Sequence, residues 1–405
     1  SKIENVFKEL DGSINSGSGS MQAKIGSAVG ALQETGKLGG ITPTSFFGDL
    51  PNMMTEIKHQ DMNMFDSMNI VFKELKRTQN KKELQQILKP FNLFAANFVG
   101  ALNQHAVVRE EMTGALAKYR ASFYKYTGFT GLMQRMKSGM FMAMQNHYGI
   151  LAKTNAWNQL TDQTKINFGL YKIDEGMWNI MRKSTLREFE GYELLTLENF
   201  KDIPKSDIVS YLNKTQPKLK KITDKKIKET QDMMQSKWRM FLYDRTHHGV
   251  LEPGARERSI LNQGFERGTT AGLLIRLMTK FKSFPTTVYT RKLELMVKGT
   301  GENTRYSDYI PALAYYTVLG TMFGYASLSF ADMLMGREPR DPKDPMTALA
   351  SFAKGGGGSI YVDLLNSEIS RSNGGAASTI LGPAFADAEG LFKVCLLYTS
   401  DAADE

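Results

Sequence analysis

Residues that could do chemistry are scarce in this sequence, and none of them has the spacing of a catalytic or metal site. The chain holds five histidines and one cysteine. His247 and His248 precede Glu252, but adjacent histidines point to different sides of a helix and no third ligand has metal-site spacing. No nucleophile elbow, serine–lysine dyad or distinct acid pair occurs. The sequence therefore predicts no catalytic residue, metal or cofactor, and we expect a non-enzymatic chain.

A glycine-rich stretch after Lys354 is the nearest approach to a nucleotide-binding loop. It consists of Gly355, Gly356, Gly357 and Gly358. Bare backbone amides in such a loop can bind phosphate. However, no strand precedes it and no Gly-Lys-Ser/Thr follows, as a phosphate loop requires. We interpret the four glycines as a hinge or a close contact between two helices.

A cluster of lysines is the second feature that could bind a ligand. Its members are Lys218, Lys220, Lys221, Lys225, Lys226 and Lys228. Cations at this density can meet the phosphates of nucleic acid or of anionic lipid. A solvated helix face is the more common reason for such a cluster, and no aromatic residues alternate with the lysines to stack on bases. Both interpretations stay open.

An uncharged run from Tyr309 to Ala331 is long enough to cross a bilayer, which needs roughly 20 helical residues. Gly320 and Gly324 lie one helical turn apart within it, and small residues at this spacing let helices pack closely. Tyrosines, hydroxyl residues and a proline dilute its hydrophobicity. A buried central helix is therefore favoured over conditional membrane insertion.

Helical periodicity dominates the elements that would carry these residues. Helices are expected at about 50–75, 91–102, 106–125, 130–152, 156–170, 173–190, 217–245, 255–264, 269–298, 308–335, 345–354 and 359–370. Residues 195–203 are expected to form a turn-rich connector. The predicted fold is all-α, a multi-helix array with one long uncharged central helix.

The last segment, Cys395–Glu405, has no helical period of its own and reads as a translated sequencing adapter. Excluding it removes the only cysteine and three acidic residues (Asp401, Asp404, Glu405), so the net charge moves from +9 to +9 + 3 = +12. We therefore expect a fragment of a longer reading frame. The expected segments are 1–45, a loosely packed Gly/Ser-rich entry; 46–120, an N-terminal helical region; 121–394, a helical module; and 395–405, the adapter.

Several short sequence blocks follow one another along the helical module, each occurring once. They are Tyr126–Leu132; Leu251–Arg258, with Pro253, Gly254 and Arg256; Arg276–Pro285, with Phe284 and Pro285; Gly336–Pro342, with Arg340, Asp341 and Pro342; and Gly355–Leu364, with Asp363, continuing to Gly374, Gly375 and Leu381–Pro383. This succession resembles the large polyvalent protein associated domains of tailed phages and related internal virion (ejection) proteins. Val362 stands where the family pattern has a glycine before the aspartate.

The resemblance implies a delivery role. Proteins of this kind are carried inside the virion and enter the host envelope or cytoplasm with the genome, and their enzymatic modules lie elsewhere in the chain. The expected partners are other virion proteins or a second copy, with possible contacts to host membrane and nonspecific contacts to DNA. Two alternatives stay open: a scaffold region for an upstream catalytic domain, and a nucleic-acid-binding module acting after delivery.

Overall fold

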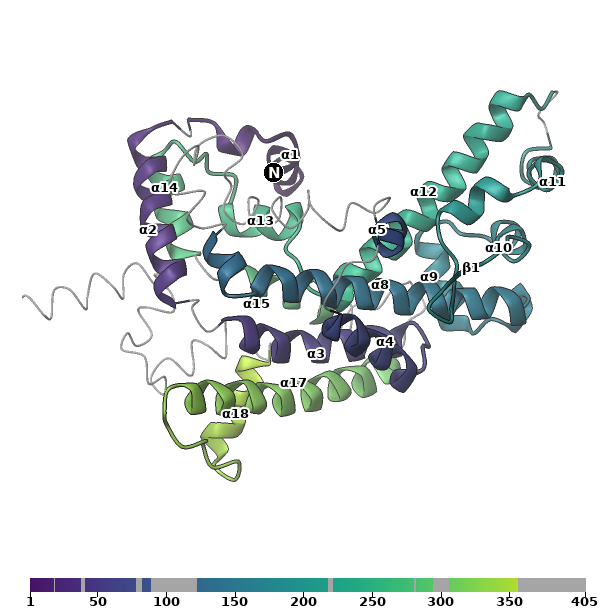
Figure 1. Cartoon of the computed structure of the whole chain (residues 1–405). Helices are drawn as coiled ribbons and strands as arrows, with labels where there is room; N and C mark the ends of the chain where they lie inside the picture. The colour runs from purple at the N-terminus through teal and green to yellow at the C-terminus, as the bar shows by residue number, and fades with distance from the viewer. Residues whose placement is uncertain are drawn as a thin grey trace, which may run out of the picture. The chain divides into compact units, whose positions relative to one another are not determined.

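The structure is a computed structural model in which helices make up most of the described chain (Figure 1). It describes residues 1–17, 19–37, 41–77, 82–88, 122–217, 221–279, 282–293 and 306–355. Within these ranges, strands are limited to one antiparallel hairpin. The predicted all-α class is therefore confirmed, apart from this small hairpin.

The chain forms two compact units, and each is discontinuous in sequence. The first unit contains Ser1–Asn52, Val99–Gly131 and Leu251–Glu405, and the second contains Met53–Phe98 and Leu132–Val250. Helices α3 (Ile41–His59) and α8 (Phe129–Thr154) each hold residues of both units. The expected segment boundaries stay predictions.

The first unit is built mainly from helices at the two ends of the described chain. Its elements besides part of α3 are α1 (Lys2–Asp11), η1 (Ser13–Asn15), α2 (Met21–Lys37), α13 (Ala255–Asn262), α14 (Thr270–Met278), α15 (Ser283–Val288), a π-helical turn (Tyr289–Leu293), α17 (Tyr306–Leu334) and α18 (Pro345–Lys354). Helix α1 packs on α13, α2 on α14, and α17 on α18 (Figure 1).

The second unit surrounds most of α8. Its other elements are part of α3, α4 (Met64–Lys76), α5 (Lys82–Leu88), η3 (Trp157–Gln159), α9 (Asp162–Leu170), α10 (Glu175–Met181), β1 (Arg187–Phe189), β2 (Tyr192–Leu194), η4 (Glu198–Asp202), α11 (Lys205–Thr215) and α12 (Asp224–Gly249). Short polar side chains begin several of these helices by accepting a backbone N–H, as Asn63, Thr161 and Thr223 do for α4, α9 and α12.

The core of the second unit is aromatic and rich in methionine. Tyr148, Phe168 and Phe241 are buried with their ring centroids 5.2–5.4 Å apart. Trp178 and Trp238 are buried beside them and donate their indole N–H groups to backbone carbonyls. Four methionines of α8 complete this core: Met136, Met140, Met142 and Met144. Unbranched methionine side chains fill the irregular spaces between large rings.

Several expectations about secondary structure are wrong. The helix expected at 156–170 is divided into η3 and α9, with Leu160 and Thr161 between them, and the one expected at 269–298 is divided after Met278 into α14 and α15. The helix expected at 50–75 is broken after α3, because Asp61 adopts a left-handed conformation with φ 54°. The helix expected at 173–190 ends at Met181, and the chain continues into the β1–β2 hairpin. Positive φ values at Glu190 and Gly191 make the tight turn that joins its strands. Residues 1–45, for which no helix was expected, contain helices α1 and α2.

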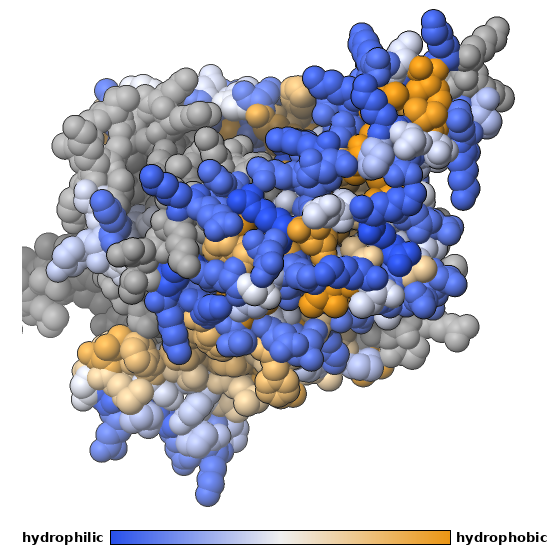
Figure 2. All heavy atoms as spheres, turned by 45° about the vertical axis from the view of Figure 1, so that its right-hand side comes forward, coloured by the Kyte–Doolittle hydropathy of each residue, from blue (hydrophilic) through white to orange (hydrophobic). Residues whose placement is uncertain are grey.

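The expected long uncharged central helix is not confirmed. Helix α17 covers residues 306–334, but no helix in the described part of the chain is both long and apolar enough to span a membrane. Hydrophobic side chains gather at the lower left of Figure 2, over α17 and α18. Tyr316 and Leu319 face inward from α17, whereas Val318 and Met322 are exposed.

Candidate functional site

Glu56 and Arg245 form a buried ion pair in the second unit. Glu56 lies on α3 and Arg245 on α12, and their side chains are 2% and 4% exposed. Arg245 Nε and Nη2 donate to the two carboxylate oxygens of Glu56, each at 2.7 Å. This two-point geometry is the strongest arrangement for an arginine–carboxylate pair. Each charge would be costly to bury alone, so each side chain depends on the other.

Uncharged side chains extend this ion pair into a network. Gln60 Nε2 donates to Glu56 Oε1 at 2.8 Å. Gln60 Oε1 accepts from Tyr148 Oη at 2.6 Å and from Asn167 Nδ2 at 3.2 Å. Asn167 Nδ2 also donates to His59 O at 3.1 Å. The network therefore joins the end of α3 to α8, α9 and α12.

The protonation states in this network are fixed by the surroundings. Burial raises the pKa of Tyr148 well above its ordinary value, so the hydroxyl stays protonated. Burial alone would lower the pKa of Arg245, but the charge of Glu56 outweighs it and the net shift is upward. A catalytic acid or base must exchange protons near the working pH and reach its substrate. Because Tyr148 and Arg245 are buried and stay protonated, we assign the network to holding the second unit together.

His147 lies beside the network on α8, with its ring 4.9 Å from that of Tyr148. Burial lowers the pKa of His147 to about 4, although the charge of Asp61 and a hydrogen bond with the Gln60 backbone favour the charged ring. Within the described residues, His147 Nε2 has no hydrogen-bond partner. The neutral ring is therefore the form that packs in the folded chain at neutral pH.

We predict that acid destabilises the second unit through His147. The unfolded chain binds a proton there near pH 6.5 and the folded chain only near pH 4, so the free energy of unfolding falls as the pH drops through this window. At about pH 4, the free energy of unfolding is lower by roughly 3 kcal/mol than at neutral pH. Urea unfolding at about pH 7 and about pH 4 measures it. His147→Gln should lose roughly 3 kcal/mol less than the wild type, and equal losses would contradict the prediction.

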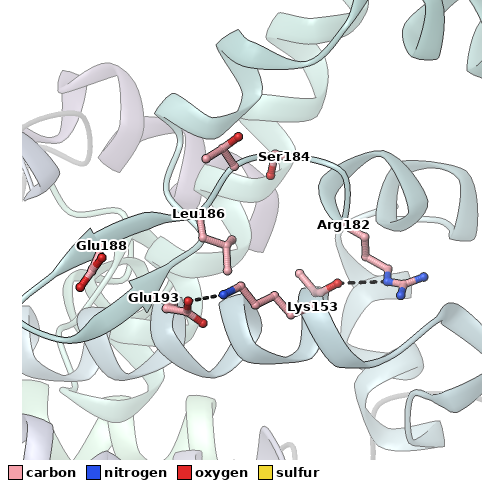
Figure 3. Close-up of a pocket in the computed structure, with 8 residues that line it drawn as sticks. Lys153, Arg182, Ser184, Leu186, Glu188 and Glu193 are labelled. Atoms are coloured by element: carbon pink, nitrogen blue, oxygen red, sulfur yellow. Dashed lines mark hydrogen bonds and ion pairs between the residues drawn. The ribbon is translucent and has the colours of Figure 1, made fainter.

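An open pocket of about 370 Å³ lies beside the β1–β2 hairpin of the second unit (Figure 3). It is lined by Ala152, Lys153, Arg182, Ser184, Thr185, Leu186, Glu188 and Glu193. Lys153 and Arg182 come from the C-terminal ends of α8 and α10, where unpaired carbonyl groups favour cations.

Four polar side chains of this pocket contact one another or the backbone. Lys153 Nζ donates to Glu193, and Arg182 Nε donates to Ala152 O at 3.1 Å (Figure 3). Ser184 Oγ donates to a backbone carbonyl, Met181 O, at 2.7 Å. A serine nucleophile needs a base within hydrogen-bond reach. The pocket offers room for a small polar ligand, but its lining holds no nucleophile–base pair.

Gly320 and Gly324 lie on the side of α17 that packs against α18. A Cβ atom on Gly324 would be 1.9 Å from Ser351 O, and one on Gly320 would be 3.3 Å from Gly355 O. A Cβ atom on Gly355 would in turn be 1.9 Å from Gly320 O. The absence of side chains at these positions therefore sets how closely the two helices approach. The remaining hinge candidates lie outside the described residues: Gly356, Gly357 and Gly358.

Pro253 and Gly254 stand immediately before α13. Gly254 N donates to Glu257 Oε2 at 2.6 Å, and Pro253 O accepts from Arg258 Nη1 at 3.2 Å. Arg256 is exposed on the first turn of this helix. The block that includes these residues therefore shapes a helix start.

Glu257 links that helix start to the π-helical turn of the same unit. Thr290 Oγ1 donates to Glu257 Oε1 at 2.8 Å, and Arg291 Nη2 lies 3.6 Å from Glu257 Oε2. Burial alone would raise the pKa of Glu257, but the charge of Arg291 and the hydrogen bonds from Thr290 and Gly254 outweigh it and lower the pKa. Glu257 therefore stays ionised and structural. Phe284 and Pro285 lie in α15, but their side chains are outside the described part.

Arg340, Asp341 and Pro342 lie in the turn between α17 and α18. Arg340 Nε donates to the buried Asp332 Oδ2 at 3.1 Å, and Arg340 O accepts from Tyr325 Oη at 2.9 Å. Asp341 accepts a backbone N–H within the turn. These contacts fold the turn back onto α17.

The basic cluster is only partly described. Lys221, Lys225, Lys226 and Lys228 fall in the described ranges, whereas Lys218, Lys220 and the motif residue Asp363 do not. Hydrophilic side chains predominate at the upper right of Figure 2, around a smaller hydrophobic patch. Glu229 and Asp232 are exposed on α12, and Lys226 Nζ lies 3.9 Å from Glu229 Oε2. The described face therefore carries mixed charge.

The adjacent histidines lie buried in the last turn of α12. His247 Nδ1 is 2.7 Å from Tyr243 O, and His248 Nε2 is 3.7 Å from Asp244 Oδ2. Across the described ranges, no group of three or more His, Cys, Asp or Glu side chains could hold a metal ion.

Sequence reasoning singled out none of the network residues around Glu56. The sequence does contain a signal that Arg245 has a buried partner, because Trp238, Phe241 and Leu242 lie with it on the apolar side of α12. A charge on an apolar helix face needs a buried partner. The identity of that partner depends on tertiary contacts.

Compared with known proteins, the chain matches no family model, no curated protein and no solved structure.

Proposed function

We propose that this chain is a non-enzymatic helical segment of a large phage protein, an internal virion component delivered into the host with the genome. The observation that carries the proposal is the ordered succession of sequence blocks between Tyr126 and Pro383. Where they are described, block residues such as Gly254, Arg340 and Gly355 lie at helix starts, turns and close helix contacts. Such positions support a structural role for the family pattern.

The proposed mechanism is conformational. The segment packs in the capsid, leaves through the tail, and rebuilds its helical contacts at the host envelope or in the cytoplasm. The uncharged run of α17 serves in this proposal as the packing partner of α18, and Gly355–Gly358 act as a hinge. The lysines near the start of α12 contact DNA or membrane phosphates, a contact that salt should weaken steeply.

Mass spectrometry of density-purified phage particles from the source sample tests this proposal. Peptides from residues 121–394 should co-sediment with the capsid and tail proteins and resist external protease until the particles are opened. Peptides found only in the host lysate, or removed by protease from intact particles, would contradict an internal virion location.

A further inference from the structure

Arg276 on α14 has no carboxylate partner in the described part of the chain, although its side chain is partly buried in the first unit. Its Nη1 donates to Phe265 O at 3.2 Å and to Gly272 O at 3.1 Å, and its Nη2 lies 3.5 Å from Ile14 O. Its Nε is buried and, among the described residues, meets no acceptor. Carbonyl oxygens satisfy hydrogen bonds but do not neutralise a full charge, and charges held inside proteins are normally paired.

A second arginine lies beside Arg276, in the loop between α13 and α14. Arg267 is 6% exposed, and its backbone N–H donates to the same carbonyl, Ile14 O, at 3.0 Å. Its Nη2 donates to Ser27 Oγ on α2, the helix that packs on α14 (Figure 1). Burial, and then the positive charge of Arg267, lower the pKa of Arg276 to about 10. The ion-paired Arg245 shows the opposite shift, so the surroundings of Arg276 disfavour its charge.

Glu9 is the carboxylate that favours the charged form of Arg276, but other donors already hold it. Its side chain is 3% exposed and accepts from Arg258 Nε at 3.2 Å and from Asn262 Nδ2 at 2.6 Å. Moving this carboxylate toward Arg276 would break both hydrogen bonds. A counter-charge for Arg276 is therefore missing from the described part of the chain.

An anion from solution would supply this counter-charge, because the partly exposed side chain of Arg276 is open to solutes. Guanidinium groups are planar donors that bind carboxylate and phosphate oxygens in pairs. A phosphate group carries a charge of roughly −1.5 to −2 at neutral pH and three acceptor oxygens, so it can accept from two guanidinium groups at once. A carboxylate has one charge and two oxygens. Two adjacent arginines therefore favour phosphate.

We propose that the first unit binds a phosphate group between Arg267 and Arg276, where the α13–α14 loop meets η1. The inference stands apart from the phage proposal, because it depends on these side chains alone. Inorganic phosphate and the backbone of a nucleic acid are two sources of this group.

Isothermal titration calorimetry of the full chain with sodium phosphate at about pH 7, in sodium chloride of matched ionic strength, tests the proposal. We expect one site per chain with a Kd of roughly 1 mM or lower. Arg276→Gln should weaken binding at least about tenfold, because it removes the charged donor. The matched control is Arg337→Gln, which changes an exposed arginine of the same unit and should leave the Kd unchanged.

A stability measurement keeps the test independent of how well the variants pack. Phosphate should raise the urea midpoint of the wild type and of Arg337→Gln, but not that of Arg276→Gln. Arg276→Lys keeps the positive charge without the planar fork, and should weaken binding at least about threefold.

No binding of inorganic phosphate by the wild type, or equal Kd values for the wild type and Arg276→Gln, overturns the proposal. A short DNA oligonucleotide, added to the phosphate complex, then separates the two sources. Displacement of phosphate assigns the group to a nucleic acid backbone, and a complex that keeps its phosphate assigns the site to the free ion.

Discussion

Replacing Arg245 with methionine is expected to lower the free energy of unfolding of the second unit by roughly 3–5 kcal/mol. The substitution leaves the Glu56 carboxylate buried without the two hydrogen bonds that Arg245 donates to it. Gln60 alone cannot compensate the charge. Urea unfolding followed by the fluorescence of the buried Trp178 and Trp238 measures the change in this unit.

A paired substitution separates the buried charge from the lost packing. In Glu56→Gln with Arg245→Met, the buried charge is gone and the amide oxygen at position 56 can still accept from Gln60. This variant should recover most of the stability lost by Arg245→Met alone. A single variant that loses less than about 1 kcal/mol, or a paired variant as unstable as the single one, would contradict the assigned role of the ion pair.

Substituting Gly324 by alanine is expected to separate α18 from α17. The added Cβ atom would lie 1.9 Å from Ser351 O and 2.8 Å from Gly355 N, and both are backbone atoms that no rotamer change can move. Overpacking of this kind costs roughly 3 kcal/mol when the backbone must shift. Amide hydrogen exchange measures the effect, and the amides of α18 should exchange markedly faster in the variant.

Gly169→Ala is the matched control for this experiment. Gly169 is also helical, on α9, and a Cβ atom there would meet nothing within 4 Å. Alanine should leave stability unchanged or raise it by roughly 0.5–1 kcal/mol, because glycine is the more flexible residue in the unfolded chain. Unchanged exchange in α18 of Gly324→Ala would show that the close approach of the two helices does not hold them together.

Much of the helical architecture was predictable from local sequence. The helix expected at 130–152 is observed at 129–154, and the one expected at 345–354 has the same bounds in the structure. These helices have clear apolar periodicity or a strong start signal, such as Asp344, which accepts the N–H groups of Met346 and Thr347.

The missed elements depend on short or non-local features. Each hairpin strand has three residues, too few for a period-two pattern to stand out, and its turn uses Glu190 rather than Asn or Asp before Gly191. The break at Asp61 is not visible in the sequence, because the residues on both sides of it keep helical spacing. The ion pair between Glu56 and Arg245 joins residues 189 positions apart, so no local pattern contains it.

The most direct test of the proposed function is long-read sequencing across the genomic locus, with adapters trimmed, to recover the whole reading frame and its neighbours. We expect portal, tail and capsid genes on either side of this frame. Conjugation or other mobile-element genes in their place would contradict an internal virion component and point to a protein delivered by another route.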